Sequence, residues 1–108
     1  MTQNFLSRSS NYLVIDVPVK GWAKDHTEQL LKRYTDVRIM GTFEELTDES
    51  DDDKIVEYCM NNSSDLLTKD KRAYTFAFKV GVKKVLIERC GVDEGHNNAP
   101  VFILRFLD

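Results

Sequence analysis

Residues 51–72 predict a helix, a buried strand and the start of a second helix in direct succession. Three aspartates, Asp51 to Asp53, open the first helix, where the exposed N–H groups and the helix dipole favour negative charge. The strand over residues 66–68 is short and apolar, and Asp70 follows it closely. Binding sites in open α/β sheets form beyond the carboxyl ends of the strands. This stretch therefore brings carboxylates toward one edge of a sheet.

The alternation of strand and helix continues along most of the chain. Strands are expected over residues 12–15, 37–40, 66–68, 85–87 and 101–107, and helices over residues 22–34, 52–61 and 71–79. Residues 90–99 are rich in Gly and Asn and are expected to form a loop. Alternating strands and helices favour a parallel sheet with helices on both faces. If the apolar strand 101–107 lies at the sheet edge, it could pair with a second copy in a homodimer.

A chain of 108 residues suits one domain, expected over residues 1–108 with residues 1–10 as a loose lead-in. No apolar run approaches the roughly 20 residues of a membrane span, and the first residues lack the apolar run of a signal peptide. We therefore expect no membrane segment and a cytoplasmic location. Cys59 and Cys90 are far apart and form no CxxC pair, which favours two free thiols over a zinc site or a disulfide.

The net charge of −3 conceals an uneven distribution of acids. Residues 44–53 carry seven acids and no base, which leaves 11 acids and 15 bases in the rest of the chain. One interpretation is a metal site beside a basic, phosphate-binding surface. The alternative is that residues 44–53 form a solvated loop whose acids have no common role.

Three carboxylates stand at the expected ends of these elements. Asp16 ends the first strand, Asp52 opens a helix, and Asp70 follows the third strand. Convergent carboxylate oxygens are the ligands that hard cations such as Mg²⁺ prefer. Each Asp also has a purely structural interpretation, since Asp16 could cap a turn and the other two could cap helices.

After the Asp that ends the first strand come Asp52-x-x-Ile55, then Leu-Leu-Thr-Lys-Asp-Lys at residues 66–71, then Gly-Val-x-x-Val-Leu-Ile at residues 81–87. Across residues 12–88, this pattern resembles the PIN domain, and within it the short PIN-like proteins. The resemblance implies a three-layer α/β/α fold with a mainly parallel sheet of four or five strands. It also implies a ribonuclease that depends on Mg²⁺ or Mn²⁺.

Carried over by position, the resemblance implies that Asp16, Asp52 and Asp70 are the catalytic residues. The same three residues and Asp53 are the implied metal ligands, with Asp51 or Asp53 as alternatives to Asp52 in register. Phosphodiester hydrolysis by such enzymes requires an activated water and stabilisation of charge on the phosphate, and one or two magnesium ions provide both.

Polar and basic residues beside the proposed site are candidates for substrate binding: Thr68, Lys69, Lys71, Arg72 and Lys20. Lys24 is a candidate in the same way as Lys20. Cationic side chains bind backbone phosphates, although as surface charges they need no function. Thr68 either positions Asp70 or is only a strand residue. Trp22 and Tyr74 could stack on an unpaired base or belong to the core.

These observations favour a ribonuclease acting on single-stranded RNA, with an antitoxin-like protein partner if the chain is the toxin of a toxin–antitoxin pair. The alternative is a catalytically degenerate PIN-like domain that binds RNA or protein. Two departures from the family favour it: Val-Pro-Val follows Asp16, and only Glu44 or Glu45 could supply a further acid. A phosphoacceptor domain of flavodoxin-like type is a third hypothesis, which lacks adjacent acids after the first strand.

Overall fold

The computed structural model describes residues 11–75 and 80–107. In these ranges the chain is an α/β fold with one five-stranded mixed sheet, four α-helices and one 3-10 helix. The strands are β1 Tyr12–Ile15, β2 Asp36–Ile39, β3 Ser64–Thr68, β4 Lys84–Asp93 and β5 Ala99–Leu107. The helices are η2 Val17–Val19, α1 Lys20–Asp25, α2 Thr27–Leu31, α3 Asp52–Asn61 and α4 Lys71–Thr75. The expected lead-in 1–10 and the end of the expected helix 71–79 lie outside the described residues.

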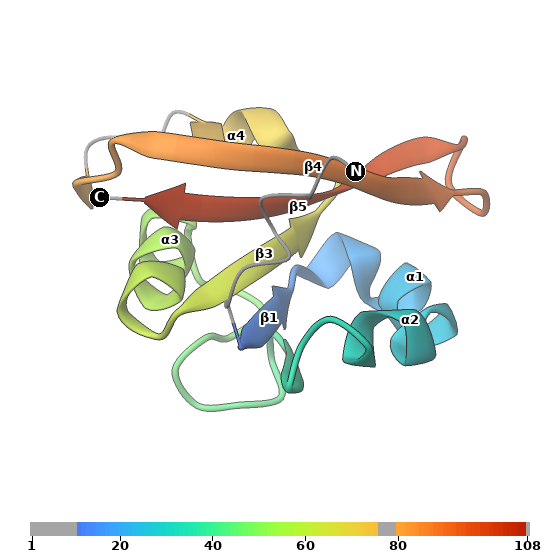
Figure 1. Cartoon of the computed structure of the whole chain (residues 1–108), viewed down its shortest axis with the longest axis horizontal. Coiled ribbons are helices and arrows are strands. Elements are labelled where there is room, and N and C mark those ends of the chain that lie inside the picture. The colour runs from blue at the N-terminus through green and yellow to red at the C-terminus, as the bar shows by residue number, and fades with distance from the viewer. Residues whose placement is uncertain (1–10, 76–79, 108) are drawn as a thin grey trace, which may run out of the picture.

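The strand order in the sheet is β2-β1-β3-β5-β4 (Figure 1). β1 pairs in parallel with β2 and β3, whereas β5 runs antiparallel to both β3 and β4. The expected parallel pairing therefore holds for β2, β1 and β3, and the sheet as a whole is mixed. β5 lies inside the sheet, so residues 101–107 do not form the edge strand on which pairing with a second copy depended.

β4 and β5 form a β-hairpin, with residues 90–93 at the end of β4 and Ala99 at the start of β5, so the loop expected over residues 90–99 is confined to residues 94–98. Asn97 and Asn98 have positive φ values of 58° and 54°. The N–H of Ala99 donates to the carbonyl oxygen of His96 at 3.1 Å. Two consecutive residues at positive φ build the type I′ turn, whose twist matches that of the flanking strands. The Asn pair therefore forms a type I′ turn at the end of the hairpin loop, residues 94–98.

Two hydrophobic clusters pack against the sheet, and strand residues alternate between them. Leu13 and Ile15 belong to a cluster with residues of α1 and α2, whereas Val14 belongs to a cluster with residues of α3 and α4. This alternation follows because successive side chains of a strand point to opposite faces. Cys59 lies in the second cluster and Cys90 packs against the first, which agrees with two free thiols.

The helix expected over residues 22–34 is divided into α1 and α2 at His26, which has φ −118° and ψ 21°. The hydroxyl of Thr27 donates to the main-chain carbonyl oxygen of Ala23 at 3.1 Å. The His26 ring stacks on Trp22 with 3.9 Å between ring centroids. Local side-chain bonds of this kind compete with a regular helix.

Within residues 11–75 and 80–107, no helix has both the length and the apolar character needed to cross a membrane.

Trp22 packs closely against β4 at Gly91, beside a bulge in that strand. A Cβ atom at Gly91 would lie 2.8 Å from Cζ2 of the indole, so a larger residue would force the ring to move. The indole N–H donates to the carbonyl oxygen of Val92 at 2.9 Å. Of the two interpretations of Trp22, the structure therefore supports a core residue.

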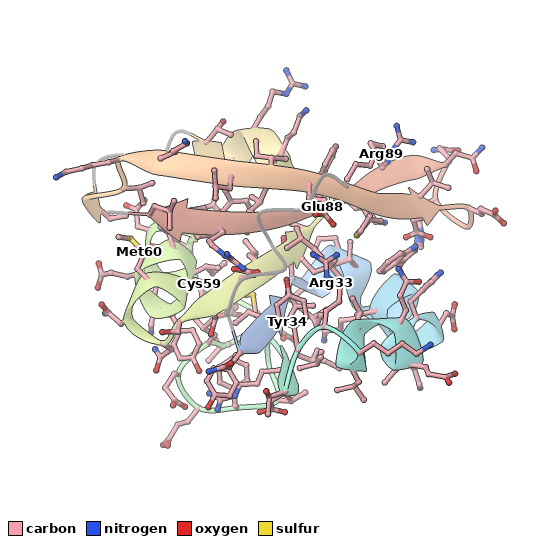
Figure 2. The ribbon with its side chains drawn as sticks, viewed as in Figure 1. Arg33, Tyr34, Cys59, Met60, Glu88 and Arg89 are labelled. Carbon is pink, nitrogen blue, oxygen red and sulfur yellow. The ribbon has the colours of Figure 1, made fainter. Side chains whose placement is uncertain are left out.

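Asp65 on β3 is fully buried and accepts hydrogen bonds from two side chains. Arg105 donates from Nε and Nη2 to its two oxygens at 2.9 and 3.1 Å, and the Tyr34 hydroxyl donates at 2.7 Å. Burial, with the neighbouring Asp65 charge, raises the pKa of Tyr34, so its hydroxyl remains a donor. The Arg33 guanidinium lies 5.9 Å from the Tyr34 ring centre and pairs with Glu88 at 2.7 Å (Figure 2). These contacts tie β3, β4 and β5 to the segment after α2.

Candidate functional site

An acidic cavity of about 330 Å³ lies where β1 and β3 end and α3 begins. Its lining includes Tyr74 and four aspartates, Asp16, Asp48, Asp52 and Asp70. Asp16 directly follows β1, Asp52 is the first residue of α3, and Asp70 lies between β3 and α4. Three predicted carboxylates from distant parts of the sequence therefore line one cavity.

Asp16 is the most buried of the four acids, with 9% of its surface exposed. Its Oδ1 accepts from the Val17 N–H at 3.0 Å, and its Oδ2 accepts from the hydroxyls of Thr68 at 2.8 Å and Tyr74 at 3.3 Å. A carboxylate offers about four acceptor positions, so these bonds orient Asp16 and leave little capacity unused.

Thr68 connects two of the acids. It is fully buried at the end of β3, and its hydroxyl donates to Asp16 and accepts from the main-chain N–H of Asp70 at 3.1 Å. The Asp70 carboxylate accepts from the N–H of Ala73 at 3.2 Å and so also caps α4. One hydroxyl therefore sets the spacing of the acids after β1 and β3, which supports the positioning interpretation of Thr68.

The proximity of the acids affects the protonation of Asp52 and Tyr74. Partial burial raises the pKa of Asp52, and the charges of Asp16 and Asp70 raise it further, against a hydrogen bond with Tyr74 that lowers it. Burial and the charges of Asp16 and Asp52 raise the pKa of Tyr74, so its hydroxyl stays protonated at neutral pH. Tyr74 is thus a neutral donor between two carboxylates, not a surface ring free to stack on a base.

Asp48 is a fourth acid of the cavity, which the sequence analysis included only as one of the seven acids of residues 44–53. Its Oδ1 lies 3.8 Å from Nζ of Lys20. Gly41, at φ +90°, allows this approach, because a Cβ atom there would overlap the Asp48 carboxylate. Glu44 and Glu45, the acids considered for a further family position, line a different depression of the surface. The sequence signal that includes Asp48 is the acidic run 44–53, which does not distinguish Asp48 from its six other acids.

No protein-family model, curated protein or solved structure matches the chain. The PIN resemblance therefore depends on the sequence pattern and stays a prediction.

The other residues predicted to bind phosphate have different surroundings. Lys69 pairs with Asp93 of β4 at 2.7 Å, and this ion pair lowers the pKa of Asp93. The ammonium of Lys71 lies 4.8 Å from the centre of the Phe102 ring, and Arg72 is exposed on α4. None of these three lines the acidic cavity, whereas Lys20 pairs with Asp48, one of its carboxylates.

The donor set of the acidic cavity fits a hard divalent cation. The side-chain atoms that could bind a metal are carboxylate and hydroxyl oxygens, and Mg²⁺ and Mn²⁺ bind such oxygens together with several waters. A cation would also relieve the repulsion that contributes to the raised pKa of Asp52. Asp53 is not part of the lining. In the described ranges, no three His, Cys, Asp or Glu side chains already surround one common metal position.

We expect the raised pKa of Asp52 to make part of the folding stability depend on pH. The folded state favours the protonated carboxyl, so the contribution is complete below the unfolded pKa of about 4 and is lost as pH rises through the folded value. Without metal, the free energy of unfolding of the wild type minus that of Asp52→Asn should therefore fall as pH rises above about 4. Urea unfolding at a series of pH values measures this difference, and a flat or rising difference would contradict the expectation.

Proposed function

We propose that the chain is a PIN-like ribonuclease that depends on Mg²⁺ or Mn²⁺ and hydrolyses phosphodiester bonds of single-stranded RNA. One observation carries the proposal: Asp16, Asp52 and Asp70, from three separate elements, line a single cavity. The three-layer α/β/α arrangement of the PIN family belongs to the same proposal, as do a cytoplasmic location and an antitoxin-like protein partner.

In this proposal, Asp16, Asp52 and Asp70 hold the cation, and Asp48 supplies a further oxygen. A bound Mg²⁺ or Mn²⁺ provides an activated water and neutralises charge on the phosphate. Thr68 holds the Asp16 carboxylate and the main chain of Asp70 in fixed positions, because its hydroxyl bonds to both. The site is thereby organised before RNA binds, which is the condition for efficient electrostatic catalysis.

Two other side chains act on the carboxylates. The Tyr74 hydroxyl bonds to Asp16 and keeps the acids together against their mutual repulsion. Lys20 pairs with Asp48 and places a positive charge beside the cavity, where a phosphate would approach.

Calorimetric titration with Mn²⁺ tests the proposal. Wild-type protein should bind about one equivalent, and Asp70→Asn should weaken binding at least about tenfold, a loss of 1.4 kcal/mol or more. Asn is as good a helix cap as Asp, so Asp70→Asn should fold normally. Asp51→Asn is the matched control, because Asp51 caps α3 through the Lys54 N–H at 3.0 Å and does not line the cavity. Absence of binding to the wild type at millimolar Mn²⁺ would overturn the proposal.

A PIN-like domain without catalysis is the second candidate, and the bonding of Asp16 favours it. Three hydrogen bonds already engage this carboxylate, which leaves little capacity for a cation. In that case a chelator would leave RNA affinity unchanged, and no cleavage products would appear with Mn²⁺ present.

A further inference from the structure

A second hollow, the apolar groove, has a volume of about 440 Å³ and lies between α1, the start of α2 and strands β1 and β2. Its apolar walls are Ile15, Val37, Ile39 and Ala23. The volume falls within the range of about 300–1,000 Å³ that small-molecule sites have. The groove could therefore hold a compact apolar group.

The polar residues of the groove suit an anion that also carries N–H donors. Lys20 and Lys24 line it, and none of its lining residues in the described ranges is acidic. The hydroxyls of Thr27 and Thr42 donate to main-chain carbonyl oxygens, at 2.9 Å to Lys24 and at 2.6 Å to Ile39. Since each hydroxyl hydrogen is used, these two oxygens remain as acceptors at the groove.

The apolar groove adjoins the acidic cavity. Ile15 of the groove belongs to the cluster with α1 and α2, whereas the cavity is lined by residues of the cluster with α3 and α4, so the two hollows lie on opposite faces of the sheet and approach each other beyond the end of β1. Lys20 also lines the groove, and its ammonium is 3.8 Å from Asp48 of the cavity. A ligand that reaches both sites would have its apolar part in the groove and its charged linkage near the carboxylates.

We propose that the apolar groove binds one unpaired base of a single-stranded RNA, while the adjoining phosphate meets Lys20 and Lys24. This inference rests on the proposed ribonuclease function and adds a base-binding subsite to it. A nucleotide joins a flat apolar group with N–H donors to an anion within a single unit, which matches the walls, the threonine oxygens and the lysines of the groove.

An acidic peptide fits the groove less well. Ile15 lies on β1, which is inside the sheet between β2 and β3, so the groove lies over a face of the sheet. An extended peptide that adds to a sheet pairs along the outer edge of an edge strand, here β2. The position of the groove therefore favours a compact base over an added strand.

Binding of a short single-stranded oligoribonucleotide that carries the fluorescent base 2-aminopurine tests the inference, with a chelator present to prevent cleavage. Gly21 lines the groove, and its Cβ position has no atom within 4 Å, so a side chain can begin there and Gly21→Leu should narrow the groove. Gly21→Leu should weaken binding at least about tenfold, whereas the smaller Gly21→Ala should change it much less. Circular dichroism verifies that both variants are folded.

Two further comparisons separate the base from the phosphate. The same oligonucleotide with an abasic site in place of the fluorescent base should bind wild-type protein about tenfold more weakly. Lys24→Gln should reduce the slope of log affinity against log salt concentration by about 0.7, the value for one phosphate of a single strand. Lys32→Gln, an exposed lysine just after α2 that does not line the groove, should leave the slope unchanged.

Equal binding of the abasic and parent oligonucleotides would overturn the inference. It would also be overturned if a glutamate-rich peptide bound the wild type more tightly than RNA and lost this binding in Gly21→Leu. Cleavage assays with Mn²⁺ distinguish this failure from failure of the proposed function. If RNA is cleaved and Gly21→Leu binds it normally, the base subsite is wrong and the ribonuclease stands. If the groove variants lose binding but no RNA is cleaved, the subsite stands and the ribonuclease is wrong.

Discussion

Asp16→Asn is expected to weaken Mn²⁺ binding at least about a hundredfold and to abolish RNA cleavage. Mutation of residues that only support metal ligands costs about 10–100-fold in affinity, so loss of a direct carboxylate ligand should cost no less. The expected loss is large because Asp16 is the most buried acid of the cavity, where its charge would interact strongly with a bound cation. Calorimetry with Mn²⁺ and gel assays of RNA cleavage measure the two effects.

The fold of Asp16→Asn should survive. Asn has the same shape and can still accept from the Thr68 hydroxyl, so the free energy of unfolding should fall by only about 1–2 kcal/mol. Unfolding in urea verifies this. Full Mn²⁺ affinity in a folded Asp16→Asn protein would show that the cavity does not hold the cation through this residue.

Asp65→Leu is expected to destabilise the fold by about 3–5 kcal/mol, a large part of the 5–15 kcal/mol that typical domains have. Asp65 is fully buried, and its loss would leave a guanidinium that is 13% exposed without its carboxylate and the Tyr34 hydroxyl without its acceptor. Removal of one partner of a buried ion pair is costly because the remaining charge stays buried away from water. Urea unfolding gives the free energy.

A double-mutant cycle separates the ion pair from the rest of this effect. Arg105→Met removes the other charge, and the combination of Asp65→Leu with Arg105→Met should cost clearly less than the sum of the two single changes. Asp36→Ala is the exposed control: its side chain is 50% exposed and pairs with Arg38, so the loss should stay below about 1 kcal/mol. Additive costs in the cycle would show that Asp65 and Arg105 are not energetically coupled.

The gathering of Asp16, Asp52 and Asp70 could be predicted from sequence because each adjoins an element with a clear local pattern. Short apolar runs mark the ends of β1 and β3, and consecutive acids mark the start of α3. Strands β1 and β3 are parallel neighbours, so their carboxyl ends meet at one edge. The parallel half of the sheet is thus encoded by local periodicity, and so are these three site residues.

Contacts between distant residues account for what the sequence did not reveal. Asp65 precedes the apolar pair of β3, and a charged residue there suggests an exposed position. Its burial depends on Arg105, 40 positions away, which donates hydrogen bonds to the Asp65 carboxylate. Asp48 joins the acidic cavity because the main chain at Gly41 leaves room for its carboxylate. The antiparallel half of the sheet was missed because the Asn97-Asn98 turn resembles a loop in composition.

The place of β5 has a consequence for how the chain is made. It is the last strand in sequence, yet it lies between β3 and β4. During translation, β1, β2 and β3 can pair as soon as residues 12–68 leave the ribosome, but β3 then keeps an open edge until residues 99–107 follow. Open strand edges promote aggregation, and pairing between distant segments is slow. The vulnerable period of a newly made molecule is therefore the interval between synthesis of β3 and arrival of β5.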